Sequence, residues 1–241
     1  MDSCHPLAIL TMPMSPAWSG SNLLAVFAMW VVMMIAMMLP SALPMILMHQ
    51  RMAKKSKNAF ENLSFTFSYL FIWVIFSIIA VIFQFTAQKV GFLDPASLKI
   101  STIISIILLI LAGVYQFTEL KNTCLSKCRT PAGFFMGFWQ SGVIGAFNMG
   151  IRHGLFCLGC CWAIMLLLFV GGVMNLTWVL LLTIAVIAEK TLPAGEFISR
   201  AIGVVLILAA AYMGYGLIYA DNMQPMNGMM MECMGSIKMD N

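Results

Sequence analysis

The chain has 241 residues, of which 61% are hydrophobic and only 9% charged, with a formal net charge of +4 and a mean hydropathy of +0.94. A soluble domain needs charged residues at roughly a quarter to a third of its surface positions, so this composition excludes a soluble globular protein. The positive charge does not indicate a nucleic-acid partner, because Lys and Arg are confined to short segments between apolar runs, where they set membrane topology.

Several apolar segments approach or exceed the roughly 20 residues with which a helix crosses a lipid bilayer, and two further segments are shorter. They predict an all-α fold, a polytopic transmembrane helical bundle of about six spans plus one interfacial or re-entrant segment, in a bacterial or archaeal cell membrane. Residues 1–21 form a short N-terminal segment, residues 22–219 the bundle and residues 220–241 a flexible Met-rich tail. The expected spans are residues 22–48, 64–86, 98–118, 155–170, 176–188 and 201–219.

The first expected span is rich in methionine. Met29, Met33 and Met37 are four residues apart and therefore lie on one face of a helix, with Met38 on a neighbouring line. Thioethers bind Cu(I) weakly, which suits passing an ion along. The spacing predicts a copper relay through Met33, Met37 and Met38, although methionines of this kind also serve simply to pack helices.

The fourth and fifth spans are expected to form a hairpin. Residues 155–188 are too long for one crossing, and Gly171, Gly172 and Asn175 supply a turn. The preceding apolar segment, residues 134–149, is interrupted by glycine and polar residues, so it can span, lie in the interface or re-enter.

Basic residues favour one of these arrangements. If residues 134–149 do not span, ten of the thirteen Lys and Arg residues lie on one side of the membrane, whereas the division is eight against five if they do. The positive-inside rule therefore predicts six spans, with both termini outside and the basic loops in the cytoplasm.

The sequence HGLFCLGCCW, residues 153–162, places three thiols and an imidazole together. His153, Cys157 and Cys161 follow one another at intervals of four, and Cys160 is three residues after Cys157, so their side chains project from adjoining strips of one helix face. Thiolates and imidazole suit Cu(I) or Zn, whereas Mg or Ca would require carboxylate oxygens.

A second cysteine pair, Cys124 and Cys128, lies in the segment before these thiols. The predicted topology brings both groups to one membrane leaflet, near the inner face. A single buried cysteine usually only packs, but five of the seven cysteines occur at ligand spacings. The sequence therefore predicts a metal site formed by Cys124, Cys128, His153, Cys157, Cys160 and Cys161.

Other polar residues give weaker signals. Glu189 and Lys190 fall at the end of a span, where a local ion pair or snorkelling suffices. His49 falls in a loop, so no Ser/His/acid triad is expected, and no phosphate-binding glycine pattern occurs. No catalytic residue is predicted, and an ion-handling protein is favoured over an enzyme.

The chain resembles the predicted metal-binding integral membrane proteins of unknown function, some of which are labelled copper chaperones. The resemblance rests on AMMLPSALP at residues 36–44, YQFTELKNTCLSKCRTP at 115–131, GLFCLGCCWAIM at 154–165, and GVMNLTWV followed by Glu189 and Lys190. It implies a helical membrane fold and a suspected metal site at Cys124, Cys128, Cys157, Cys160, Cys161, Met37 and Met38.

These features predict an integral membrane protein that binds Cu(I), or alternatively zinc, for transport or for delivery to a membrane metalloenzyme or metallochaperone. Two other classes stay open. Cys157 and Cys160 form a C-x-x-C pair that, with Cys124 and Cys128, would serve a thiol-disulfide oxidoreductase, although helical spacing strains such a disulfide. The third class is an accessory subunit of a membrane metalloenzyme.

Overall fold

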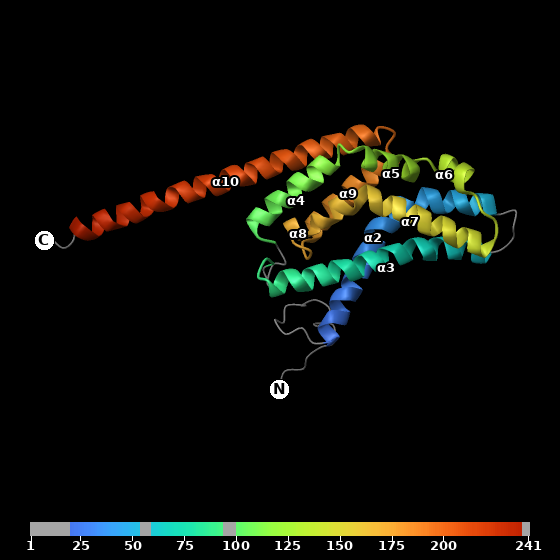
Figure 1. Cartoon of the computed structure of the whole chain (residues 1–241), viewed down its shortest axis with the longest axis horizontal. Helices are drawn as coiled ribbons and strands as arrows, with labels where there is room; N and C mark the ends of the chain where they lie inside the picture. Colours follow the sequence, from blue (N-terminus) through green and yellow to red (C-terminus); the bar gives the residue numbers. More distant parts are fainter. Residues whose placement is uncertain (1–19, 54–58, 94–99, 238–241) are drawn as a thin grey trace.

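The computed structural model of the chain describes residues 20–53, 59–93 and 100–237, and the side chains of residues 22–53, 60–93 and 100–219. These residues form a bundle of helices, from which the second half of the last helix projects (Figure 1). The predicted all-α fold is confirmed. In chain order the helices are α2 (Gly20–Ala53), α3 (Ala59–Lys89), α4 (Thr102–Tyr115), α5 (Glu119–Arg129), α6 (Pro131–Phe138), α7 (Gly142–Leu166), α8 (Leu168–Gly171), α9 (Leu176–Thr191) and α10 (Gly195–Ile237).

Four segments are long and apolar enough to cross a membrane. They are Asn22–Ala53, Phe60–Lys89, Gly142–Gly171 and Gly195–Tyr219. Helices α4 and α5 together make a fifth candidate, bent by 66° in the manner of a broken span or a re-entrant loop. Helix α9 has only 16 residues, fewer than a perpendicular crossing needs. The structure thus supports four to five candidate spans, and the expected count of six is not confirmed.

The uncertain apolar segment, residues 134–149, is divided between two helices. Helix α6 ends at Phe138, and α7 begins at Gly142, whose positive φ of 86° suits glycine. The expectation that the next span begins at residue 155 is therefore wrong. Since α7 starts much earlier, the thiols of residues 157–161 lie near the middle of the candidate span Gly142–Gly171 and not at its start.

The predicted turn after α7 is confirmed. Gly172 adopts a positive φ of 88°, which ends α8. The Asn175 side chain then caps α9 by accepting a hydrogen bond from the Trp178 backbone N–H at 3.2 Å.

Helix α7 packs closely along α3. Gly154 makes this possible, because a Cβ atom there would lie 2.8 Å from Ile72 Cγ1. Gly150 likewise faces the Phe65 carbonyl and the Ser68 hydroxyl. Small residues at such crossings let helix backbones approach. Gly150 and Gly154 are therefore contact points between α7 and α3.

Helix α2 runs antiparallel to α3. Near one end Trp30 Nε1 donates to Gln84 Oε1 at 2.8 Å, and near the other His49 Nδ1 lies 2.7 Å from Asn62 Oδ1. Helix α2 remains helical through Pro40 and Pro44 and bends along its course (Figure 1), as helices with internal proline do.

A buried ion pair joins α5 to α9. Lys121 is fully buried, and its Nζ atom lies 2.9 Å from both carboxylate oxygens of Glu189. Lys121 also donates to Gln116, whose side-chain oxygen accepts a second hydrogen bond from the Ser199 hydroxyl at 3.0 Å. The bend between α4 and α5 thus directs Lys121 into a network that also includes α10.

Replacing Lys121 by methionine should strongly destabilise the fold. The Glu189 carboxylate would stay buried without its cation, which costs about 3–5 kcal/mol. In a Lys121→Met/Glu189→Met double variant most of this loss should be recovered, because neither charge remains. Thermal unfolding of the purified protein in detergent measures both effects, with Lys127→Met on the same helix as control. Equal unfolding midpoints for the single and double variants would contradict this account.

Candidate metal centre

Helix α5 brings its two cysteines against the cysteine-rich part of α7. A Cβ atom at Gly159 would lie 2.9 Å from Cys124 Sγ, so the absence of a side chain there makes room for Cys124. The Tyr115 hydroxyl, at the end of α4, donates a hydrogen bond to the Gly159 carbonyl. Both contacts hold the Cys124 end of α5 over the turn of α7 that carries the other thiols.

Cys128 and Cys160 bring two sulfur atoms from different helices together. Their Sγ atoms, one on α5 and the other on α7, lie 4.0 Å apart. Two sulfur ligands bound to one ion at about 2.3 Å each can be at most about 4.6 Å apart. The pair can therefore share one soft ion without movement of either helix.

Cys157 lies beside a buried ammonium group. Its Sγ atom is 2.9 Å from Lys190 Nζ and 3.2 Å from the Tyr69 hydroxyl. The positive charge attracts the thiolate form of Cys157, which is the form that binds metals. Lys190 Nζ is also 3.4 Å from Ser41 Oγ and 4.0 Å from Met38 Sδ. The ammonium group therefore lies between a thiol of α7 and a thioether of α2.

Cys160 and Cys161 point in different directions, as neighbouring residues on a helix must. In this state both thiols donate to the Cys157 carbonyl, at 3.1 Å and 2.9 Å respectively. Both are buried in the apolar core, but only Cys160 is in contact with Cys128 Sγ.

His153, one helical turn before Cys157, is enclosed by aromatic rings. It stacks on Tyr69 with ring centroids 5.3 Å apart and meets Phe134 edge-on at 5.7 Å. The side chain is only 3% exposed, and its Nδ1 atom has no hydrogen-bond partner. A buried nitrogen without a partner is costly, so its position calls for a functional explanation.

These groups do not form a closed metal site. In the part of the chain that the structure describes, no three His, Cys, Asp or Glu side chains are already grouped to hold an ion. A structural zinc site has four ligands around one point. The arrangement consists instead of two adjoining units, Cys128 with Cys160 and Cys157 with Lys190.

The predicted methionines divide between two places. Met33 and Met37, together with Met29 and Met174, line a groove of about 700 Å³ between α2 and the start of α9. Met38 is fully buried and lies next to Lys190. We call the thiols of Cys128, Cys157, Cys160 and Cys161 the thiol cluster. Because Met37 and Met38 are consecutive residues, the methionine groove and the thiol cluster meet at this turn of α2.

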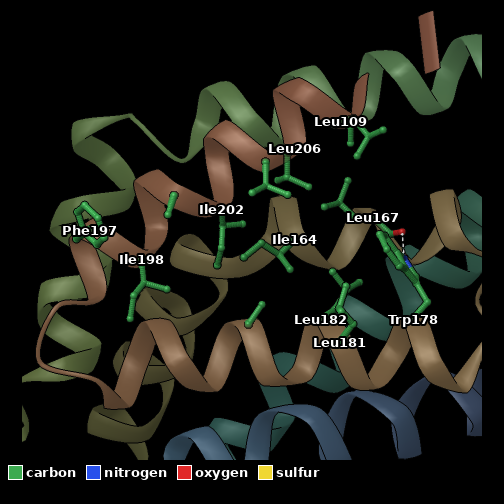
Figure 2. Close-up of a pocket in the computed structure, with 14 residues that line it drawn as sticks. Leu109, Ile164, Leu167, Trp178, Leu181, Leu182, Phe197, Ile198, Ile202 and Leu206 are labelled. Carbon is green, nitrogen blue, oxygen red and sulfur yellow. Dashed lines mark hydrogen bonds between the residues drawn. The ribbon is translucent and has the colours of Figure 1, made fainter. Parts of the chain in front are cut away.

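A second hollow is chemically unlike the methionine groove. It has a volume of about 420 Å³ and lies between α4, α7, α9 and α10 (Figure 2). Leu206 and Ile164 are among its lining side chains, and the hydrogen bond drawn there joins Trp178 Nε1 to the Leu167 carbonyl at 2.7 Å. Its lining residues carry no sulfur, imidazole or carboxylate, so this pocket offers no ligand to an ion.

Several side chains around the thiols are not predicted from the sequence. The interpretation of Lys190 as a snorkelling residue is wrong, because it is 8% exposed and turned toward Cys157. The placement of His49 in a loop is also wrong, since α2 continues to Ala53 and buries it. Lys190 could have been identified as a functional candidate from the sequence, because it is an ionisable residue in an apolar segment. Tyr69 and Ser41 have no comparable feature in the sequence.

Comparison with known proteins adds one match. The sequence family described as PpoB2, copper chaperone, matches residues 27–213, a range that includes the five cysteines at the site. No curated protein and no solved structure matches the chain.

Replacing Lys190 by methionine should slow alkylation of Cys157 by N-ethylmaleimide roughly tenfold at neutral pH. The thiolate is the reacting form, and the ammonium group is what favours it in a buried position. Lys190→Arg keeps the positive charge and should react nearly as fast as the wild type. Mass spectrometry of peptides from the full-length protein measures the rate, and equal rates for all three proteins would contradict this role of Lys190.

Proposed function

Because the chain belongs to the PpoB2 copper chaperone family, we propose that it is an integral membrane protein that binds Cu(I) and delivers it to an acceptor protein. The observation that carries this proposal is the 4.0 Å separation of Cys128 Sγ and Cys160 Sγ, with Cys157 on the same turn of α7. Soft thiolate ligands select Cu(I) over hard cations.

The membrane location is supported by the surface of the bundle. Large apolar side chains such as Ile79, Ile82 and Leu181 are exposed on the helices, and lipid would cover them. Arg129 Nη2 donates to the carbonyls of Leu192 and Pro193, so the end of α5 and the turn between α9 and α10 lie together. This basic end would face the cytoplasm of a bacterial or archaeal cell.

Within the site, Cys128 and Cys160 would hold the ion, and Cys157 would complete the ligand set when Lys190 moves aside. Cys124 and Cys161 lie beside this set. Zinc remains the alternative, but it prefers four ligands in a tetrahedron, whereas a pair of thiolates with a third nearby suits the low coordination of Cu(I).

The methionine groove would supply the ion. Met33 and Met37 line it, and Met38 lies beside the Cys157 and Lys190 pair. Thioethers hold Cu(I) less tightly than thiolates do, so the ion would pass from the groove to the cysteines. The acceptor would be a membrane metalloenzyme or a soluble metallochaperone.

Titration of the full-length protein with Cu(I), without oxygen and against bicinchoninate, tests the site. Cys128→Ser and Cys160→Ser should each lower the affinity by at least about a hundredfold, since loss of even an outer-shell partner of a metal ligand costs about 10- to 100-fold. Cys161→Ser should have a smaller effect, and Ser126→Ala, exposed on α5, should have none. Unchanged affinity in the first two variants, or tighter binding of zinc than of Cu(I), would contradict the proposal.

The same sulfur separation favours a thiol-disulfide oxidoreductase as second candidate. The relevant pair is then Cys128 and Cys160, because Cys157 and Cys160 lie on one helix, where a disulfide is strained. Alkylation of the protein in native membranes, followed by mass spectrometry, distinguishes the two functions. The copper proposal expects free thiols at both positions, whereas a Cys128–Cys160 disulfide in metal-free protein would support the oxidoreductase.

A further inference from the structure

The imidazole of His49 has the surroundings of a metal ligand. It lies near the end of α2 that is remote from the methionine groove and is only 1% exposed. Its Nδ1 atom is 2.7 Å from Asn62 Oδ1. Because an amide oxygen accepts hydrogen bonds, Nδ1 carries the proton and Nε2 presents its lone pair. Histidines that bind metals are typically oriented in this way by a second partner.

Aromatic rings and sulfur atoms surround this imidazole. The ring stacks on Phe65 at 4.6 Å with an interplanar angle of 12°, and Phe135 lies 5.8 Å away. Met45 and Met52 are four residues before and three after His49, so they share its face of α2. Met45 is buried in the same cluster as the two phenylalanines, and Met52 packs against that cluster. One imidazole and two thioethers therefore gather on a face shielded by aromatic rings.

The His49 face is connected to the thiol cluster through adjoining rings. Phe65 also stacks on His153 at 6.1 Å, and His153 stacks on Tyr69, whose hydroxyl lies 3.2 Å from Cys157 Sγ. His153 Nδ1 is buried and has no hydrogen-bond partner, as a nitrogen reserved for a passing ion would be. Both imidazoles are therefore in contact with the same Phe65 ring.

We propose that His49, with Met45 and Met52, forms a second, weaker Cu(I) site, which His153 links to the thiols. This inference rests on the proposed function and adds the exit side of the route. Helix α2 ends and α3 and α7 begin at this end of the bundle, where α6 also lies (Figure 1). Only ligands are exchanged, and the copper remains Cu(I) throughout. A neutral imidazole and two thioethers bind the ion less tightly than thiolates, so this site fills once the thiols are occupied, and an acceptor can take the ion from it.

Cu(I) titration of the full-length protein in detergent, with X-ray absorption spectroscopy of the loaded protein, tests the second site. The wild type should bind a tight ion and a weaker one, with nitrogen among the copper ligands. His49→Phe keeps a ring against Phe65 and should lose only the weaker ion and most of the nitrogen signal. Met136→Leu, an exposed methionine of α6, is the control and should bind both ions.

A Cys128→Ser/Cys160→Ser variant separates this proposal from the first one. It should lose the tight ion and keep the weaker one with its nitrogen ligand. If this variant keeps the tight ion, the thiol site is overturned while the His49 site stands. If His49→Phe binds both ions with unchanged affinity and nitrogen signal, the His49 site is overturned and the thiol site stands.

A second variant, which conserves side-chain volume, tests the site even if His49→Phe fails to fold. Met45→Leu/Met52→Leu removes two sulfur atoms and leaves the imidazole and its stack in place. It should weaken the second site by at least about a hundredfold, since loss of even an outer-shell partner of a metal ligand costs about 10- to 100-fold, and leave the tight site unchanged. Identical affinities for both ions in this variant and the wild type would exclude the thioethers as ligands.

Discussion

A charge buried in an apolar bundle must be paired, and this requirement fixes how α5, α7 and α9 meet. Glu189 and Lys190 are adjacent on α9, so their side chains leave the helix about 100° apart. Glu189 reaches Lys121 on α5, and Lys190 reaches Cys157 on α7. Leaving either charge unpaired would cost several kcal/mol. Neither α5 nor α7 can slide along α9 without that cost, so the two pairs together hold α5 in the position that sets Cys128 4.0 Å from Cys160.

The same pairing explains how thiolate can exist in an apolar core. A lone thiolate at Cys157 would be as unfavourable as a lone ammonium at Lys190, but the two compensate each other at 2.9 Å. The tyrosine hydroxyl of Tyr69 adds a hydrogen bond to the sulfur atom. In the proposed function, Cu(I) carries the same charge as the ammonium group that it would displace from the sulfur. The thiolate stays compensated during this exchange, and the displaced ammonium group balances the negative charge that a second thiolate ligand adds.

Local patterns in the sequence predict the helices and the turn at Gly172, because these depend on apolar runs and on residues with special backbone preferences. The start of α7 is not predicted, since Gly150 and Gly154 weaken the apolar pattern although they serve as contacts with α3. The cysteine positions predict that α5 lies near α7, but they do not predict which sulfur atoms meet. Partners such as Tyr69 and Lys190 depend on contacts between helices distant in the sequence, which no local pattern contains.

An ion carrier must bind its cargo tightly enough to capture it and loosely enough to release it, as conducting sites do. A closed set of four ligands would favour retention, and in the part of the chain that the structure describes the His, Cys, Asp and Glu side chains form no such set. The sulfur atoms instead fall into a thioether groove, a thiol pair and a thiol held by an ammonium group. Each unit supplies fewer ligands than a closed site needs, so in the proposed function an ion would move between them by exchange of one ligand at a time. In the proposed function, division of the ligands into small adjoining units is therefore what would distinguish this bundle from a protein that stores its metal.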